Sequence, residues 1–192
     1  MKMKKMNLLI LLVGLTALVS AQTRYNLDNT GSSIVVEGTS SVHDWEMEAN
    51  GLKSAVVLHF NDNKLTEIKD AEFSCLAENV VSDNSIMNNK THDALKAKKH
   101  PQISFRLKSV DRLDVTGNSV SGEVSGILKI AGVSQSIRFN FTGHLNPGHM
   151  FTISGTVPLM MSDFNIDPPT AMLGALKTGD KVKINFKFIY KS

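Results

Sequence analysis

Residues 133–157 read VSQSIRFNFTGHLNPGHMFTISGTV and contain two alternating stretches joined by a turn signal. In each stretch, apolar or small residues fall at every second position: Ile137, Phe139 and Phe141 in the first, and Phe151, Ile153, Gly155 and Val157 in the second. This period places one face of a strand inward and the other in water. In the intervening Asn146-Pro147-Gly148, proline presets φ and glycine accepts positive φ, which suits a type II turn. The stretch therefore predicts an antiparallel hairpin.

The same pattern extends outward along the chain. Gly117-Asn118 and Ala131-Gly132 are two-residue hairpin signals, and they join residues 102–115, 119–130, 133–145 and 149–161 into an antiparallel meander. Further strands are predicted at 24–28, 32–39, 44–50, 54–60, 65–77 and 181–190. The count is about ten, although short neighbours can merge into one strand. Closing the sheet into a barrel would remove its exposed edges, so an all-β antiparallel barrel is expected.

Two segments lack the alternation. Ser85 to Lys99 predicts a short helix that ends before His100-Pro101, and Asp167 to Leu176 can start a helical turn after its two prolines. The fold expected is thus one all-β domain with one or two short helices.

The first 21 residues resemble a secretory leader. Three lysines precede an apolar run from Leu8 to Val19, and small residues follow before Gln22. We expect a signal peptide over 1–21, a mature domain over 22–192, and a periplasmic or secreted location. The leader carries three lysines and no acids, so the remaining chain has as many basic as acidic residues, 18 of each. A neutral chain without a basic block gives no reason to expect nucleic acid binding.

Catalytic and metal-binding motifs are sparse. The chain has no phosphate loop, no dinucleotide fingerprint and no Gly-x-Ser-x-Gly elbow. Its six histidines form no His-x-His pair, and His43-Asp44 could act as a metal or triad pair only at a turn. The single cysteine, Cys75, lies in a strand-like context and is expected to be a buried small hydrophobe. We expect no enzyme activity, no cofactor and no metal.

Several inward-facing positions are small. Gly122, Gly126 and Gly155 fall on the apolar faces of their strands. They either mark bends at barrel corners or leave room for a cavity. Methionines at 160, 161 and 172 flank a proline-containing segment, where flexible thioethers could line a ligand mouth or simply fill the core.

Several motifs in order resemble the YceI-like family. They are Thr39–Trp45 (TSSVHDW), Ser85–Met87 with Leu95–Ala97, His100–Phe105 (HPQISF), Gly126–Val133 (GILKIAGV), Ser162–Ile166 (SDFNI) and Lys177–Val182 (KTGDKV). The resemblance covers nearly the whole mature chain. It implies an antiparallel, lipocalin-like β-barrel of about eight main strands whose apolar pore holds a polyisoprenoid or other long amphipathic lipid, in a family without established enzymes. Where many relatives carry an Arg-Asp pair, this chain has Asn88 to Leu95 (NNKTHDAL), so the head group does not follow from the resemblance.

The function expected is a non-catalytic carrier of an isoprenoid-like or fatty lipid, with transient membrane contact possible. The alternative is a stress-response or interaction module whose barrel is filled by its own side chains and which acts through its surface. Trp45 is expected to be largely buried, closing or lining the barrel. The lipid contacts are expected among residues on apolar strand faces: Phe105, Leu107, Phe139, Phe141, Ile153, Phe186 and Phe188. An adaptable rim at one end of the barrel, beside the Ser85–Lys99 helix, is expected from Met160, Met161, Phe164, Met172 and Leu173. The segment that carries these residues would cross the opening and act either as a fixed plug or as a gate.

Overall fold

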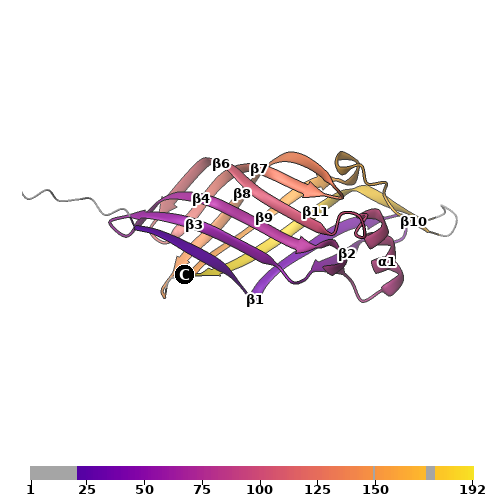
Figure 1. The fold of residues 1–192 in the computed structure, drawn as a ribbon, viewed down its shortest axis with the longest axis horizontal. Helices are drawn as coiled ribbons and strands as arrows, with labels where there is room; N and C mark the ends of the chain where they lie inside the picture. The colour runs from indigo at the N-terminus through magenta and orange to yellow at the C-terminus, as the bar shows by residue number, and fades with distance from the viewer. Residues whose placement is uncertain (1–20, 149, 172–175) are drawn as a thin grey trace, which may run out of the picture.

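A computed structural model describes residues 21–148, 150–171 and 176–192. Strands dominate it, with one α-helix and two short 3₁₀ turns (Figure 1). The elements are β1 (Ala21–Ser40), β2 (Trp45–Ala49), β3 (Lys53–Asn61), β4 (Lys64–Leu76), η1 (Ala77–Asn79), β5 (Val80–Val81), α1 (Ser85–Ala94), β6 (Gln102–Thr116), β7 (Ser119–Ile130), β8 (Val133–Asn146), β9 (Met150–Met160), η2 (Met161–Phe164), β10 (Thr170–Ala171) and β11 (Leu176–Lys191).

Eight strands close into an antiparallel barrel. Their order is β11-β9-β8-β7-β6-β4-β3-β1, and β1 returns to pair with β11. The closing ladder joins the two ends of the domain, for example Asn26 with Lys191 and Ile34 with Phe186. The expected all-β barrel of about eight main strands is therefore confirmed, and closure leaves no free edge in this ring.

The long wall strands arise by merging shorter predicted ones. The segments predicted at 24–28 and 32–39 form the single strand β1, which has an irregularity between Asp28 and Ser33 that contains Gly31 at φ +81°. β2 and β3 pair in succession with the same edge of β1, interrupted around Gly51 at φ +63°. Positive φ is readily accessible to glycine, so these two residues let the chain kink without leaving the wall.

The predicted hairpins are present. Ala131 and Gly132 both have positive φ, 50° and 84°, and they connect the β7–β8 ladder at its closing pair Ile130–Val133. Gly117 and Gly148 also have positive φ in the turns at the other ends of the meander. Gly117, Gly132 and Gly148 thus adopt the positive φ that their places in the turns predict, whereas positive φ at Ala131 is uncommon for a residue with a Cβ.

α1 begins at Ser85 as predicted, but it ends at Ala94, whereas the predicted helix extended to Lys99. The Asn84 side chain caps it by accepting hydrogen bonds from the backbone N–H groups of Ile86 and Met87, at 3.0 and 3.1 Å. No helix in the described part of the chain has the length and hydropathy needed to span a bilayer.

The helical turn predicted over Asp167 to Leu176 does not start after the prolines, and residues 172–175 of this segment lie outside the described residues. Thr170 and Ala171 form β10 and pair with Lys177 and Leu176 at the start of β11, so extended backbone finds a partner there. The helical turn occurs earlier, as η2, and it is tied to β11: the N–H and Oγ of Ser162 donate to the Asp180 carboxylate at 2.9 and 2.6 Å.

The buried apolar side chains form a main core along the barrel and a smaller cluster at the α1 end. Leu58, Val120 and Phe151, each at most 1% exposed, belong to the main core, near the ends of their strands away from α1. A smaller cluster packs η2 and its following residues against the β7–β8 hairpin: Leu128, Ile130, Ala131, Phe164 and Ile166. α1, β2 and β10 gather at one end of the molecule, and the C-terminus lies at the other (Figure 1).

Candidate functional site

A cavity of about 490 Å³ occupies the barrel interior. Its walls are almost entirely apolar and come from every strand of the closed ring. Eight of the nine phenylalanines line it, Phe60 being the exception. Its lining also includes exposed residues from α1 and the start of β11, such as Ile86 and Lys177, so the mouth lies at the α1 end.

The residues predicted to contact a ligand gather in this one place. All those that the structure describes line the cavity: Trp45, Phe105, Leu107, Phe139, Phe141, Ile153, Met160, Met161, Phe164, Phe186 and Phe188. The other two, Met172 and Leu173, lie outside the described residues. The role of all these residues in ligand binding stays a prediction. The period-2 alternation of the sequence nevertheless identified residues that share one inner surface.

Aromatic rings form a connected surface along the cavity wall. Phe73 stacks on Phe188 with ring centroids 5.7 Å apart, and Phe188 lies 5.4 Å from Phe186. Phe186 meets Phe139 edge-on at 5.7 Å, and Phe139 meets Phe105 at 5.6 Å. Such offset and edge-on arrangements are favourable between rings. The series crosses from β4 through β11 and β8 to β6, so residues distant in sequence form one apolar face.

The inward glycines do not leave empty space. A Cβ on Gly122 would lie 2.8 Å from the Phe141 ring, and one on Gly155 would lie 2.8 Å from the Phe186 ring. Phe105 lies over Gly126 in the same way. Of the two alternatives for these glycines, the one in which their missing side chains leave the cavity is therefore not supported. Each glycine leaves space that a neighbouring phenylalanine occupies, and the cavity is what remains between the rings.

Few polar groups reach the deep part of the cavity. Ser54 Oγ and the Tyr190 hydroxyl are 2.7 Å apart, and Ser54 Oγ donates to the Glu72 carbonyl oxygen at 2.5 Å. Burial raises the pKa of Tyr190 to about 12, and burial also raises the pKa of the Cys75 thiol to about 11. Both lining groups are therefore neutral at physiological pH. The Glu72 carboxylate pairs with Arg24 at 3.1 Å on the outer side.

The mouth combines an indole, a polar helix and two lysines. Trp45 is only partly buried, so its burial is less complete than predicted, and its Nε1 donates to the Thr39 carbonyl oxygen at 3.0 Å. α1 has no buried residue, yet Met87 and Thr91 line the cavity. Lys90 and Lys177 are exposed lining residues at this end.

α1 is anchored beside the mouth by polar contacts. Ser82 N–H donates to Asn88 Oδ1 at 2.7 Å, and Asn88 Nδ2 returns a bond to the Ser82 carbonyl at 2.9 Å. His92 Nε2 lies 3.0 Å from the Val80 carbonyl oxygen, to which it donates. Polar contacts therefore hold the helix beside the opening, although none of its own side chains is buried.

The segment after β9 is held more firmly than an open rim would be. Phe164 is 2% exposed within the small cluster, whereas Met160 is 40% exposed. Gln135 Nε2 donates to the Asp163 carbonyl at 2.5 Å, and Lys96 Nζ donates to the Asn165 carbonyl at 3.0 Å, which places the segment beside the α1 region as predicted. These contacts favour a plug at Phe164 and leave Met160 as the adaptable part.

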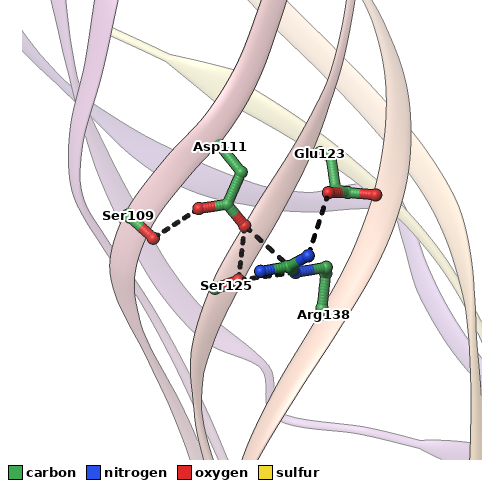
Figure 2. A network of polar contacts seen from close by, with 5 residues as sticks. All are labelled: Ser109, Asp111, Glu123, Ser125 and Arg138. Atoms are coloured by element: carbon green, nitrogen blue, oxygen red, sulfur yellow. Dashed lines mark hydrogen bonds and ion pairs between the residues drawn. The ribbon is translucent and has the colours of Figure 1, made fainter.

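A polar network of five residues lies on the outer side of the barrel wall. Figure 2 shows the Asp111 carboxylate accepting hydrogen bonds from Ser109 and Ser125, with Arg138 bridging to Glu123. Asp111 falls between the register pairs Val110–Val124 and Arg112–Glu123, so it is the extra residue of a β-bulge. The Ser125 and Ser109 hydroxyls lower the pKa of Asp111. This network ties three strands together across the bulge.

No metal-binding group emerges from the described residues: none of their His, Cys, Asp and Glu side chains form a cluster of three or more. His43 Nδ1 lies 2.6 Å from the backbone oxygen of Asp44, so the predicted pair meets through the main chain, not through the Asp44 carboxylate. Cys75 is buried, as predicted.

Sequence reasoning missed much of the wall contributed by β1, β3 and β4. Val56 and Phe73 line the cavity, but register shifts between Ala55 and Val57, and again between His59 and Phe60, break the alternation of β3 against β4. Asp70 at φ 48° changes the phase of β4. A period-2 pattern cannot be followed across a bulge, because the extra residue exchanges inner and outer faces.

A closed antiparallel barrel around an apolar cavity that opens at one end is a lipocalin-like architecture. The model of the YceI-like domain matches residues 25–190, and the chain belongs to this family. No curated protein matches the chain.

Solved structures share the fold at low sequence identity. BcnA of Burkholderia cenocepacia aligns with TM-score 0.66 and 20% identity, covering 85% of this chain and 98% of that one. A polyisoprenoid binding domain from Saccharophagus degradans, implicated in plant cell wall breakdown, aligns with TM-score 0.69 and 14% identity, covering 88% and 98%. The Campylobacter jejuni YCEI protein aligns with TM-score 0.59 and 19% identity, covering 76% and 84%.

Proposed function

We propose that this protein binds one long apolar lipid of the isoprenoid type inside its barrel and carries it without chemical change. One observation carries the proposal: an apolar cavity of about 490 Å³ walled by eight of nine phenylalanines. This volume lies within the usual range of roughly 300–1,000 Å³ for small-molecule sites. The solved polyisoprenoid binding domain with the same fold adds support for this ligand class.

Physical chemistry supports binding through the tail alone. Burying one CH₂ group is worth about 0.8 kcal/mol, so ten would contribute on the order of 8 kcal/mol before association costs. A charged group would lose its hydration in the apolar interior, whereas Lys90 and Lys177 stand at the mouth, where a charged group could remain in water. A neutral hydroxyl can enter the interior when it finds a hydrogen-bond partner there. The cavity therefore suits an amphipathic lipid.

The mouth also offers a surface for exchanging lipid with a membrane. Four large hydrophobic residues among the described ones are strongly exposed: Val42, Leu76, Ile86 and Met160. Ile86 and Met160 line the cavity, and Val42 lies in the loop between the lining residues Ser40 and His43. We propose that these three touch a bilayer transiently while lipid passes, since a long apolar lipid crosses water poorly.

The proposal also includes export of the protein from the cytoplasm. The leader-like first 21 residues motivate a periplasmic or secreted carrier whose mature chain starts at Gln22. N-terminal sequencing of exported protein tests this, and a retained leader would refute it.

Mass spectrometry of organic extracts from the purified protein tests the binding function. We expect one class of long isoprenoid-like lipid at up to one molecule per chain. The rival function, a surface-acting module with a filled barrel, would yield no stoichiometric lipid, and the size of the cavity argues against it.

A further inference from the structure

The deep end of the cavity holds a hydrogen-bond chain whose direction can be assigned. Ser54 Oγ has one proton, and the Glu72 backbone carbonyl at 2.5 Å can only accept it. The contact of 2.7 Å between Ser54 Oγ and the Tyr190 hydroxyl must therefore be donated by Tyr190. Both protons of the pair are committed within the protein, so the groups that remain available are oxygen lone pairs.

This pair lies far from the mouth. Tyr190 stands 13 residues along β11 from Lys177, which is roughly 43 Å of strand at about 3.3 Å per residue. It stacks near Phe151 with centroids 6.4 Å apart and is 3% exposed. The other polar lining side chains come from the mouth segments, apart from Glu72, which pairs outward with Arg24. Tyr190 and Ser54 thus supply the polar side chains at the cavity floor.

We propose that the floor pair Tyr190–Ser54 selects lipids whose inward end carries a hydrogen-bond donor, such as a hydroxyl, over lipids that present only an acceptor, such as a carbonyl. This rests on the proposed lipid-binding function and adds the chemistry of the inward end. An alcohol can donate to the Tyr190 oxygen without disturbing the chain, whereas a carbonyl meets lone pairs or must break the Tyr190–Ser54 bond.

A matched ligand pair tests the proposal. Farnesol and farnesal share a carbon skeleton and differ in a hydroxyl donor against an aldehyde acceptor. Binding to lipid-stripped protein is followed by the fluorescence of the single tryptophan, Trp45, which lines the mouth. We expect the wild type to favour farnesol by about five- to tenfold, the usual size of one neutral hydrogen bond.

Three variants assign the preference to the floor. The double variant Tyr190→Phe with Ser54→Ala removes both accepting oxygens, so the ratio should fall toward one. Ser54→Ala removes the acceptor for the Tyr190 proton, which becomes free to donate, so the ratio should shift toward farnesal. Tyr25→Phe is the control, because Tyr25 is equally buried at 3% exposure but does not line the cavity.

The outcomes distinguish failure of the floor proposal from failure of the proposed lipid-binding function. Equal affinity of the wild type for both ligands, or a preference that survives the double variant, overturns the floor proposal and leaves lipid binding intact. Failure of the wild type to bind either ligand counts against the proposed function as well. Thermal unfolding of each variant confirms that it is folded, and Ser54→Ala alone carries the test if the double variant does not fold.

Discussion

The indole ring of Trp45 lies directly over Gly38, its partner across the β1–β2 ladder. If Gly38 carried a Cβ, the three atoms nearest to it would all belong to this ring. The absence of a side chain at Gly38 therefore allows Trp45 to lie against the wall at the cavity mouth, and a larger residue at position 38 would displace the indole ring.

A Gly38→Ala variant should displace Trp45 and destabilise the fold by about 1–3 kcal/mol, the typical cost of overpacking. Trp45 fluorescence reports the displacement, and denaturant unfolding reports the stability. Because the clash is with one side chain, Gly38→Ala should destabilise the fold much less when it is made in a Trp45→Leu background. Additive effects of the two changes would contradict this relationship.

Cavity-lining and core positions should respond differently to truncation. Leu58 is fully buried and does not line the cavity, so Leu58→Ala should cost about 2–5 kcal/mol and leave lipid retention unchanged. Phe139 is partly buried and lines the cavity, so Phe139→Ala should cost less than the roughly 3–5 kcal/mol of a core phenylalanine and release lipid. Unfolding curves and lipid extraction from the same samples provide the comparison. A core-sized loss with full lipid retention at Phe139 would mean that the barrel is packed shut.

Exposed residues at the mouth should control the rate of lipid uptake. The double variant Val42→Ser with Ile86→Ser should slow uptake from lipid vesicles about tenfold while the final amount bound stays the same. Leu76→Ser is the matched control, since Leu76 is 50% exposed but lies outside the cavity lining. Equal slowing by the control would show that general surface hydrophobicity, not the mouth, sets the rate.

The outer network should make stability sensitive to acid. Hydrogen bonds from Ser125 and Ser109 lower the pKa of Asp111, so the ionised form is favoured in the folded state. That contribution is complete above the unfolded-state pKa of about 3.9 and is lost as pH falls through the lower folded-state value. Asp111→Asn should reduce the stability lost between neutral pH and acid, measured by denaturant unfolding. Asp114→Asn, on the same strand but paired with Arg112 instead, is the control. An unchanged acid profile for Asp111→Asn would assign the network no role in stability.

Burial of Tyr190 should make stability fall in alkali. Burial raises the pKa of Tyr190 to about 12, so the folded state retains its proton more strongly than the unfolded chain, whose value is about 10. The contribution of this group is fully present below pH 10 and is lost as pH rises from about 10 toward 12, because ionisation favours the unfolded state. Tyr190→Phe should flatten this decline in denaturant unfolding. Tyrosinate absorbance during titration would contradict the assignment if both tyrosines ionised near pH 10 in folded protein.

Local pattern determined the strands, hairpins and inner faces of the meander. Alternation such as Ile137, Phe139 and Phe141 depends on neighbours two residues apart, and turn types such as Ala131-Gly132 depend on the backbone freedom of one or two residues. These are short-range properties, so the sequence alone was enough to predict them. It also predicted the aromatic part of the cavity lining on β6, β8 and β11 and the resemblance to the family, but not the wall contributed by β1, β3 and β4. Bulges at Asp70 and Asp111 shift the alternation, and they can be located only when the pairing of the neighbouring strands is known.

Tertiary structure decided closure and the space inside. The pairing of β1 with β11 joins Asn26 to Lys191 across almost the whole domain, and no local pattern specifies it. Whether Gly126 and Gly155 leave a void depends on rings from other strands: Phe105 and Phe186 fill the space over them. The direction of the Tyr190–Ser54 bond likewise depends on a carbonyl of a third strand. Cavity volume is the small difference between barrel width and the summed size of inward side chains, so it is determined only when all eight strands are assembled.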